Sequence, residues 1–155
     1  MAEGASVSVE DLYRRDGERL WRALLLYSGD REVASDAVAE AFAQLLRRGE
    51  AVSAPDRWVW KAAFRIAAGE LKTRSDIRRA VSDLGPVASG DDGRVADAVL
   101  KLSPHQRSAI VLHYFSGYTY REVATIIGST PSAVSVHITR GRRRLRALLE
   151  DLDHG

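Results

Sequence analysis

The sequence contains no cysteine and only one methionine among its 155 residues. Without cysteine the chain cannot form a disulfide or a thiolate metal site, which fits a reducing compartment. It also has no apolar run long enough to cross a membrane as a helix, which takes about 20 residues. Its first residues are acidic and polar, and they do not resemble a secretory signal peptide. We therefore expect a cytoplasmic protein with no membrane partner.

Several kinds of catalytic site are absent as well. No glycine-rich phosphate loop follows a strand, because the sequence contains no convincing strand. The histidines have no metal-ligand spacing with one another. They are His105, His113, His137 and His154. The acidic pair Asp91-Asp92 is better explained as solvated charge than as paired catalytic carboxylates. The sequence therefore predicts no enzyme, no metal and no cofactor.

The overall charge is close to neutral. With 23 Lys and Arg against 21 Asp and Glu, the formal net charge is +2. Any affinity for nucleic acid would therefore come from local patches rather than from the field of the whole chain. One such patch lies near the C-terminus and has no acidic residue before Glu150. It consists of Arg140, Arg142, Arg143, Arg144 and Arg146. A run of one sign suits the neutralisation of phosphates.

Just before the arginine run, the sequence predicts two short helices joined by a tight turn. Thr119 and Glu122 have the capping-box spacing that begins a helix, and Gly128 suits a left-handed helix end. Thr130 and Pro131 are typical of the start of the next helix. Two amphipathic helices with a glycine turn are not specific for DNA. Together with the arginines, they favour a helix-turn-helix whose second helix enters a major groove.

In that second helix, Val134 and Ile138 share a face that we expect to be buried. The residues expected to contact DNA lie elsewhere on the helix or close to its ends. They are Thr130, Ser132, Ser135, His137, Thr139, Arg140, Arg142 and Arg143. The hydroxyl and imidazole groups would form hydrogen bonds, and the arginines would bind phosphates.

Apolar residues recur at helical spacing along the rest of the chain, so we expect an all-α fold. Further helices are expected over residues 9–27, 31–48, 56–74, 94–102 and 104–117, and the last of them should bury Ile110, Val111 and either Tyr114 or Phe115. Residues 82–93 are rich in Gly, Ser and Asp, a composition typical of a flexible linker. The sequence therefore predicts two small helical domains, a three-helix body at 9–81 and a four-helix body with the helix-turn-helix at 94–151.

The third expected helix interleaves aromatic and basic residues. Proteins that bind single-stranded nucleic acid stack bases on aromatic rings and pair phosphates with cations. The residues that would contact such a strand are Trp58, Lys61, Arg65 and Lys72. The alternative is that Trp58 and Phe64 belong to the core, since a small three-helix body needs bulky anchors. Both interpretations remain open at this point.

Three segments carry a family resemblance. Residues 102–124, from Leu-Ser-Pro to Glu-Val-Ala, are similar to the pattern L-P-x-x-x-R…Y-x-x-G-x-(S/T)-Y-x-E-I-A of sigma factors of the extracytoplasmic-function group. Residues 36–42, Asp-Ala-Val-Ala-Glu-Ala-Phe, resemble the family's D-x-V-Q-E-x-F. Residues 55–63, Pro-Asp-Arg-Trp-Val-Trp-Lys-Ala-Ala, resemble its P-x-x-W-L-x-(R/K)-(V/I)-A. The likeness extends over about residues 11–149.

This resemblance implies a function in transcription initiation. The first domain would bind the clamp coiled coil of core RNA polymerase and trap melted minus-10 promoter DNA, and the second would bind the minus-35 duplex. The polymerase contacts would come from Asp36, Glu40, Gln44 and Arg47. Factors of this group are commonly inhibited by an anti-sigma protein, so such a protein is a possible partner.

The chain departs from the family pattern in both domains. In the second helix of the helix-turn-helix, Ala133, Ser135 and His137 stand at positions where the family often has Thr, Lys and Arg. Three more departures lie in the first domain. Ala39 replaces a Gln of the polymerase-docking motif, Arg65 replaces an Asn near the flipped minus-10 base, and Gly69 replaces an acidic or amide residue. These departures keep a second hypothesis open, a sigma-like DNA-binding or protein-binding regulator that does not itself open promoters. A plain helix-turn-helix repressor is disfavoured because it would leave the tryptophan-rich helix unexplained.

The sequence thus predicts two helical bodies on a tether. A tryptophan-bearing helix sealed inside one fused globule, with its cations facing away from any groove, would contradict that expectation.

Overall fold

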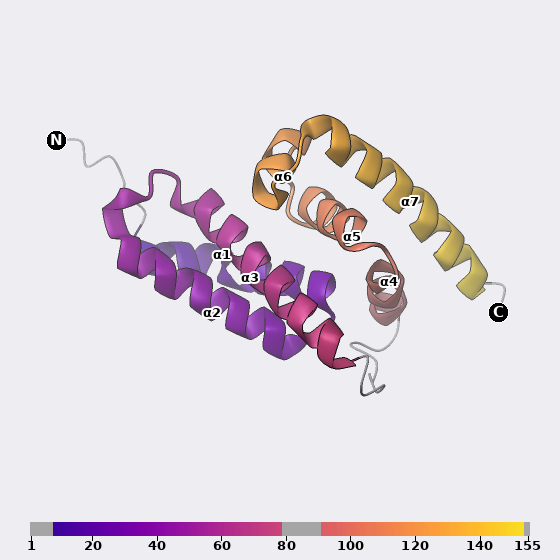
Figure 1. The fold of residues 1–155 in the computed structure, drawn as a ribbon, viewed down its shortest axis with the longest axis horizontal. Coiled ribbons are helices and arrows are strands. Elements are labelled where there is room, and N and C mark those ends of the chain that lie inside the picture. The colour runs from indigo at the N-terminus through magenta and orange to yellow at the C-terminus, as the bar shows by residue number, and fades with distance from the viewer. Residues whose placement is uncertain (1–7, 79–90, 154–155) are drawn as a thin grey trace.

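The computed structural model describes residues 8–78 and 91–153, and within these two ranges every regular element is a helix. The elements are α1 (Val9–Ser28), α2 (Arg31–Arg48), the short 3-10 helix η1 (Gly49–Ala51), α3 (Pro55–Arg78), α4 (Asp91–Leu100), α5 (Pro104–Ile110), the π-helical segment η2 (Val111–Phe115), α6 (Tyr120–Ile127) and α7 (Pro131–Asp153). Figure 1 shows α1–α3 grouped on one side and α4–α7 on the other. The predicted all-α fold is confirmed.

Helix starts and ends follow the local signals in the sequence. The Asp30 side chain accepts hydrogen bonds from the backbone N–H groups of Glu32 and Val33, at 2.8 and 3.2 Å, and so begins α2. At α6, the Thr119 hydroxyl accepts from the Glu122 N–H at 3.2 Å, and the Glu122 carboxylate accepts from the Thr119 N–H at 3.1 Å. Gly128 ends α6 with φ of 71°. Side-chain caps thus satisfy backbone donors that a helix leaves unpaired.

The predicted linker, residues 82–93, lies mostly outside the described residues. The helix α4 begins at Asp91, so it takes in the last three residues assigned to that linker. The helix α3 continues to Arg78. The division into domains 9–81 and 94–151 stays a prediction.

The first three helices form a bundle, called here the first bundle (α1–α3), and the remaining elements form the second bundle (α4–α7). In the first bundle, α2 presents the small residues Ala34, Ala37 and Ala41, none with any exposed surface, and it packs against α1 and α3. In the second bundle, α7 packs across α4, α5 and α6. Gly141 allows α7 to approach α5 closely, because a Cβ there would lie 3.0 Å from Ile110 Cγ1.

The two bundles do not lie apart. The helix α6 packs against α3, while α4 and η2 pack against α1, and buried residues from both bundles form one hydrophobic cluster. Trp60 has no exposed surface, so the tryptophan-bearing helix is sealed at this point. The expectation of two separated bodies therefore does not describe this arrangement. The predicted strand-binding cations nevertheless line cavities and do not face away from every groove.

The segment η2 corrects one sequence expectation. Ile110 and Val111 are buried as expected, but Tyr114 and Phe115, of which one or the other was expected in the core, are each 50% exposed. A π-helical turn takes an extra residue, so it rotates the following side chains out of register with the 3.6-residue pattern. Extrapolating that pattern through the segment therefore places these rings on the wrong face.

Candidate nucleic-acid interface

The outer face of α7 is polar and basic. Val134 and Ile138 are 0% and 1% exposed and hold the helix against its bundle. The polar residues expected to meet DNA are exposed except for two, which are half-buried. The exposed ones are Thr130, Ser132, Thr139, Arg140, Arg142 and Arg143, and the half-buried ones are Ser135 and His137. Figure 1 places α7 on the side of the second bundle away from α1–α3. The helix is therefore free to enter a groove.

Three of the predicted DNA-contacting residues also have contacts within the protein. The Thr130 hydroxyl accepts from the Ala133 N–H at 3.1 Å and so caps α7. The guanidinium of Arg142 lies over the Tyr114 ring, 5.9 Å from its centroid. His137 stacks on His105 of α5 with ring centroids 5.2 Å apart. The position of each of these side chains is thus set partly by the fold.

The environment of His137 changes its protonation. Burial lowers the pKa of this imidazole below its ordinary value, and the neighbouring His105 and Arg140 lower it further because each disfavours a second positive charge. His137 is therefore held as the neutral ring near neutral pH. It would offer DNA a hydrogen-bonding group rather than a cation.

The four residues predicted to contact a melted strand all lie on the side of α3 that faces the second bundle. Trp58 and Lys61 line a cavity of about 750 Å³, together with residues of α6 and the turn before it. Arg65 and Lys72 line a second cavity of about 650 Å³, whose far wall is α5 and the end of α6. The structure therefore brings these residues to one side of one helix but divides them between two cavities.

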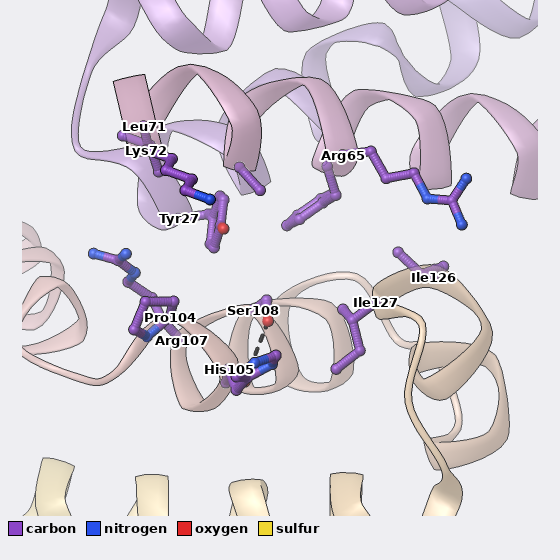
Figure 2. Close-up of a pocket in the computed structure, with 12 residues that line it drawn as sticks. Tyr27, Arg65, Leu71, Lys72, Pro104, His105, Arg107, Ser108, Ile126 and Ile127 are labelled. Carbon is purple, nitrogen blue, oxygen red and sulfur yellow. Dashed lines mark hydrogen bonds between the residues drawn. The ribbon is translucent and has the colours of Figure 1, made fainter. Parts of the chain in front are cut away.

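Figure 2 shows the second of these cavities. Lys72 extends toward Tyr27 of the first bundle, and Arg65 extends toward the other end, while His105, Arg107 and Ser108 approach from α5. Of the described residues that line this cavity, three are basic and none is acidic. Such a cavity favours an anion.

The two tryptophans of α3 have different environments. Trp58 is half-buried, and the Arg48 guanidinium lies over its ring at 5.4 Å. Trp60 is fully buried between Phe64, whose ring centroid is 6.3 Å away, and Tyr118 of the second bundle. Phe64 is 4% exposed and belongs to the core. Of the two interpretations left open by the sequence, the core one holds for Phe64, whereas Trp58 keeps access to a cavity.

Several side chains join the two bundles, and the sequence analysis had not identified them. Arg19 of α1 donates to the Ser116 carbonyl oxygen at 2.8 Å, and its guanidinium lies 5.3 Å from the Trp60 ring centroid. Arg57 of α3 pairs with Glu122 of α6 at 3.2 Å. These partners lie far apart in the sequence and share no local motif. The sequence offered one signal for this contact, the aromatic residue Tyr118, which lies in a turn where the local backbone does not require an aromatic side chain.

Burial at this contact also perturbs ionisable groups. Burial raises the pKa of Tyr118, and the nearby Asp16 carboxylate raises it further. Burial lowers the pKa of Arg107, whose guanidinium lies 5.2 Å from the centroid of the Tyr27 ring. A hydrogen bond from the Thr119 backbone lowers the pKa of Glu122. Tyr118 and Arg107 are therefore partly desolvated where the bundles meet, whereas the shift of Glu122 comes chiefly from its hydrogen bond.

The residues expected to contact polymerase lie along α2. Asp36 and Glu40 are exposed, as is Arg47, whereas Gln44 is half-buried. The Glu40 carboxylate accepts from Gln44 at 3.0 Å and from Arg47 at 3.2 Å, and these bonds lower its pKa. The helix brings three of the four residues into one connected polar face.

Neither a metal site nor a membrane span occurs in the described part of the chain. Its residues include no group of three or more His, Cys, Asp or Glu side chains placed to bind a metal ion. Among the same residues, no helix is both long and apolar enough to span a membrane.

Comparison with known proteins identifies the second half of the chain. Residues 92–145 match the family model for Sigma-70, region 4. The chain is 26% identical to the RNA polymerase sigma factor CarQ of Myxococcus xanthus, over 97% of this chain and 94% of CarQ. It is 31% identical to the probable ECF RNA polymerase sigma factor SigI of Mycobacterium tuberculosis, over 76% of this chain, but it spans only 47% of SigI.

Solved structures show the same fold. The sigma factor RpoE from Bartonella quintana, crystallised with the anti-sigma factor NepR, aligns with a TM-score of 0.73 at 21% identity, covering 91% of this chain and 98% of RpoE. CnrH, solved in complex with the cytosolic domain of CnrY, aligns with a TM-score of 0.73 at 24% identity, covering 97% of this chain and 94% of CnrH.

Three findings indicate the same family. They are the match to region 4 over the helix-turn-helix, the relatives that extend over both bundles and the shared fold. The chain belongs to the extracytoplasmic-function group of RNA polymerase sigma factors, which direct transcription and are not enzymes.

Proposed function

We propose that this sigma factor binds core RNA polymerase through α2, traps melted minus-10 DNA on α3 and binds the minus-35 duplex through α7. The observation that carries the proposal is the outer face of α7, where hydroxyl groups and arginines are exposed on a helix anchored by buried Val134 and Ile138. Such a helix presents base-contacting and phosphate-contacting groups on the same side.

Recognition by this α7 would depend more on phosphates than on bases. The outward positions of α7 include Ser132, Val136 and Thr139, which offer two hydroxyl groups and an apolar contact. Two well-placed hydrogen bonds from one guanidinium are the commonest specific contact to guanine, and none of these three residues is an arginine. Arg140 and Arg143 are exposed and placed to bind the backbone. We therefore expect modest sequence discrimination and strong salt dependence.

On α3, Trp58 would stack on an unpaired base while Lys61, Arg65 and Lys72 bind the strand's phosphates. Flipping a base out of the duplex costs a few kcal/mol, which a stacking ring and nearby cations offset. Trp58 suits this role because its ring is only half-buried, unlike that of Trp60.

The proposed partners are core RNA polymerase, promoter DNA and an anti-sigma protein, and the proposed site of action is the cytoplasm. The polar face of α2, where Glu40 organises Gln44 and Arg47, supports the polymerase contact. The likeness to RpoE, which was crystallised with an anti-sigma factor, motivates the last partner.

A second candidate is a sigma-like regulator that binds DNA or protein without opening promoters. It is favoured by the departures from the family pattern at Ala39, Arg65 and Gly69. All three residues are exposed. An exposed residue is available to a partner, so replacing the family's residue there changes the contacting surface itself. This candidate predicts binding without initiation.

Co-elution of the purified chain with core polymerase, followed by transcription in vitro from genomic promoter fragments, tests the proposal. Co-elution with specific initiation supports it, and co-elution without initiation supports the regulator. Absence of co-elution contradicts the sigma-factor role and leaves only a regulator that acts without polymerase. Glu40→Lys should weaken co-elution by roughly tenfold, since it reverses a charge at the proposed contact. Glu18→Lys is the matched control, because Glu18 is exposed on α1 and pairs only locally with Arg22.

A further inference from the structure

The cavity in Figure 2 lies between α3 with the end of α1 on one side and α5 with the end of α6 on the other. Its volume of about 650 Å³ is that of a site for a small organic ligand. We propose that this cavity binds a small amphiphilic anion, a molecule with a carboxylate or phosphate head and an apolar body about as large as naphthalene. This ligand goes beyond the proposed function and does not depend on the proposed contacts with DNA.

The walls of the cavity carry positive charge without a compensating negative charge. Arg65 and Lys72 of α3 and Arg107 of α5 line it, and none of the described residues that line it is acidic. No ion pair between described residues involves any of these three cations. Figure 2 places Lys72 and Arg107 at the same end of the cavity on opposite walls. Cations so placed repel one another, and an anion bound between them offsets that repulsion.

The guanidinium of Arg107 has fewer partners than its burial requires. The residue is half-buried, and its Nε is buried without a hydrogen-bond partner. Within the described residues, its side chain donates one hydrogen bond, from Nη1 to the Leu100 carbonyl oxygen at a long 3.4 Å. Its contact with the Tyr27 ring, at 5.2 Å from the centroid, neutralises no charge. Buried charges are normally paired, and a guanidinium offers parallel N–H groups that match a carboxylate or a phosphate.

The rest of the lining favours a ligand with an apolar body. Phe64 and Leu71 come from α3, and Ile126 and Ile127 come from the end of α6. A bare inorganic anion would leave these side chains uncovered. A ligand whose head lies near Arg107 can instead place its body against them and remove apolar surface from water.

Arg107 separates this site from the proposed contacts with DNA. Arg65 and Lys72 are common to both, and both residues are exposed, so a ligand can reach them from solvent. Arg107 belongs to α5 and is not among the residues proposed to contact DNA. Changes at Arg107 therefore test the anion site without altering those residues.

The head and the body of the ligand are tested with matched probes on the full chain, by isothermal titration calorimetry in a buffer free of phosphate and carboxylate. Naphthoate and naphthyl phosphate carry the two head groups on the same body, naphthamide has the body without the charge, and inorganic phosphate has the charge without the body. We expect at least one naphthyl anion to bind at least about tenfold more tightly than naphthamide and inorganic phosphate. The tighter of the two anions identifies the head group. Equal binding of the naphthyl anions and naphthamide overturns the proposal, and so does failure of both anions to bind.

Variants of Arg107 distinguish a ligand contact from a structural role. Arg107→Met removes the charge and should weaken binding of the naphthyl anion by at least about tenfold, while naphthamide binding stays as it was. Arg107→Lys keeps the charge but loses the parallel N–H groups, so its affinity should lie between the two. Circular dichroism checks that each variant folds. Equal weakening of the anion and of naphthamide would show that Arg107 only maintains the shape of the cavity, which overturns its assignment as the anion contact.

A filling variant tests the place of binding without changing any charge. Ala68 lines the cavity and is exposed, so Ala68→Phe can put a ring into the space intended for the body of the ligand. It should weaken binding of the naphthyl anion by at least about tenfold. Ala147→Phe is the matched control, because Ala147 is an exposed residue of α7 that does not line this cavity. A folded Ala68→Phe chain with unchanged affinity, or equal weakening by both substitutions, overturns the proposal that the anion binds in this cavity.

Discussion

The ring of Tyr118 meets the ring of Trp60 edge-on, with centroids 5.3 Å apart and planes inclined at 71°. One ring belongs to the turn before the helix-turn-helix and the other to the helix proposed to bind melted DNA. This aromatic contact is one of the links between the two proposed DNA-contacting elements, beside the Arg57–Glu122 ion pair. Edge-on pairs of this kind contribute about 0.5–1.5 kcal/mol beyond the burial of their area.

The tryptophans of α3 should separate stability from strand binding. Trp60→Ala should lower the free energy of unfolding by about 3–5 kcal/mol, because the indole has no exposed surface. Trp58→Ala should cost less stability, since its ring is half-buried, and should weaken oligonucleotide binding by about 1–3 kcal/mol because the base no longer stacks on a ring. Urea unfolding and fluorescence anisotropy measure the two effects. If Trp58→Ala reduces stability but not affinity, Trp58 acts only in packing.

Arg142 and Arg143 of α7 should contribute to the binding of any duplex, whatever its sequence. Replacing Arg142 and Arg143 by Ala should weaken duplex binding uniformly, and the slope of log K against log salt should become shallower by about 0.9 for each phosphate that is no longer neutralised. Arg142 also covers the Tyr114 ring, so each variant is measured singly as well as together. Arg14→Ala is the control, because Arg14 is exposed on α1 and pairs with Glu10. An unchanged slope would exclude a phosphate role.

Two helical glycines should respond in opposite ways to substitution. Gly141→Leu should destabilise the second bundle by about 1–3 kcal/mol. The Cβ alone would lie 3.0 Å from Ile110 Cγ1, so the rest of the leucine side chain would not fit. Gly69→Ala should stabilise the chain by about 0.5–1 kcal/mol, since the new Cβ would meet nothing within 4 Å beyond the backbone of its own helix and alanine favours a helix. Thermal or urea unfolding compares them. Equal destabilisation by both substitutions would contradict the close approach of α7 to α5.

The folded chain should lose stability as the pH is lowered, and His137 should account for part of this loss. Burial, His105 and Arg140 lower the pKa of this imidazole in the folded chain, so the unfolded chain binds the proton more readily. The contribution is fully present above the unfolded pKa of about 6.5 and is lost as pH falls below it. The melting temperature of the unmodified chain should therefore decline more steeply between pH 7 and 5.5 than that of His137→Gln. Parallel profiles for the two chains would show that His137 does not contribute.

Much of the fold was predictable because its signals are local. The start of α2 at Asp30, the capping box of Thr119 and Glu122 and the end of α6 at Gly128 each depend on residues within one helical turn. The face of α7 that is buried followed from the spacing of Val134 and Ile138. The failure at Tyr114 and Phe115 has a local cause as well, since a π-helical turn breaks the period on which the prediction depended.

The candidate site was predictable only in part. The residues expected on α7 and α2 lie on exposed or half-exposed faces, as their helical spacing required. Those on α3 also share one side, but sequence reasoning did not anticipate that this side faces the second bundle. Nor did it identify Arg19, Arg57 or Tyr118, because no sequence spacing relates them to their partners.

By itself, the sequence determined the number and order of the main helices, the capped ends at Asp30, Thr119 and Gly128, the helix-turn-helix and the basic character of its second helix, since these follow from neighbouring residues and composition. Only the tertiary structure decided that the two bundles share one hydrophobic cluster and that Trp60 is buried while Trp58 borders a cavity. The physical reason is that burial depends on residues remote in the chain. Arg19 and Ser116, for example, are 97 positions apart and meet only when the bundles pack together.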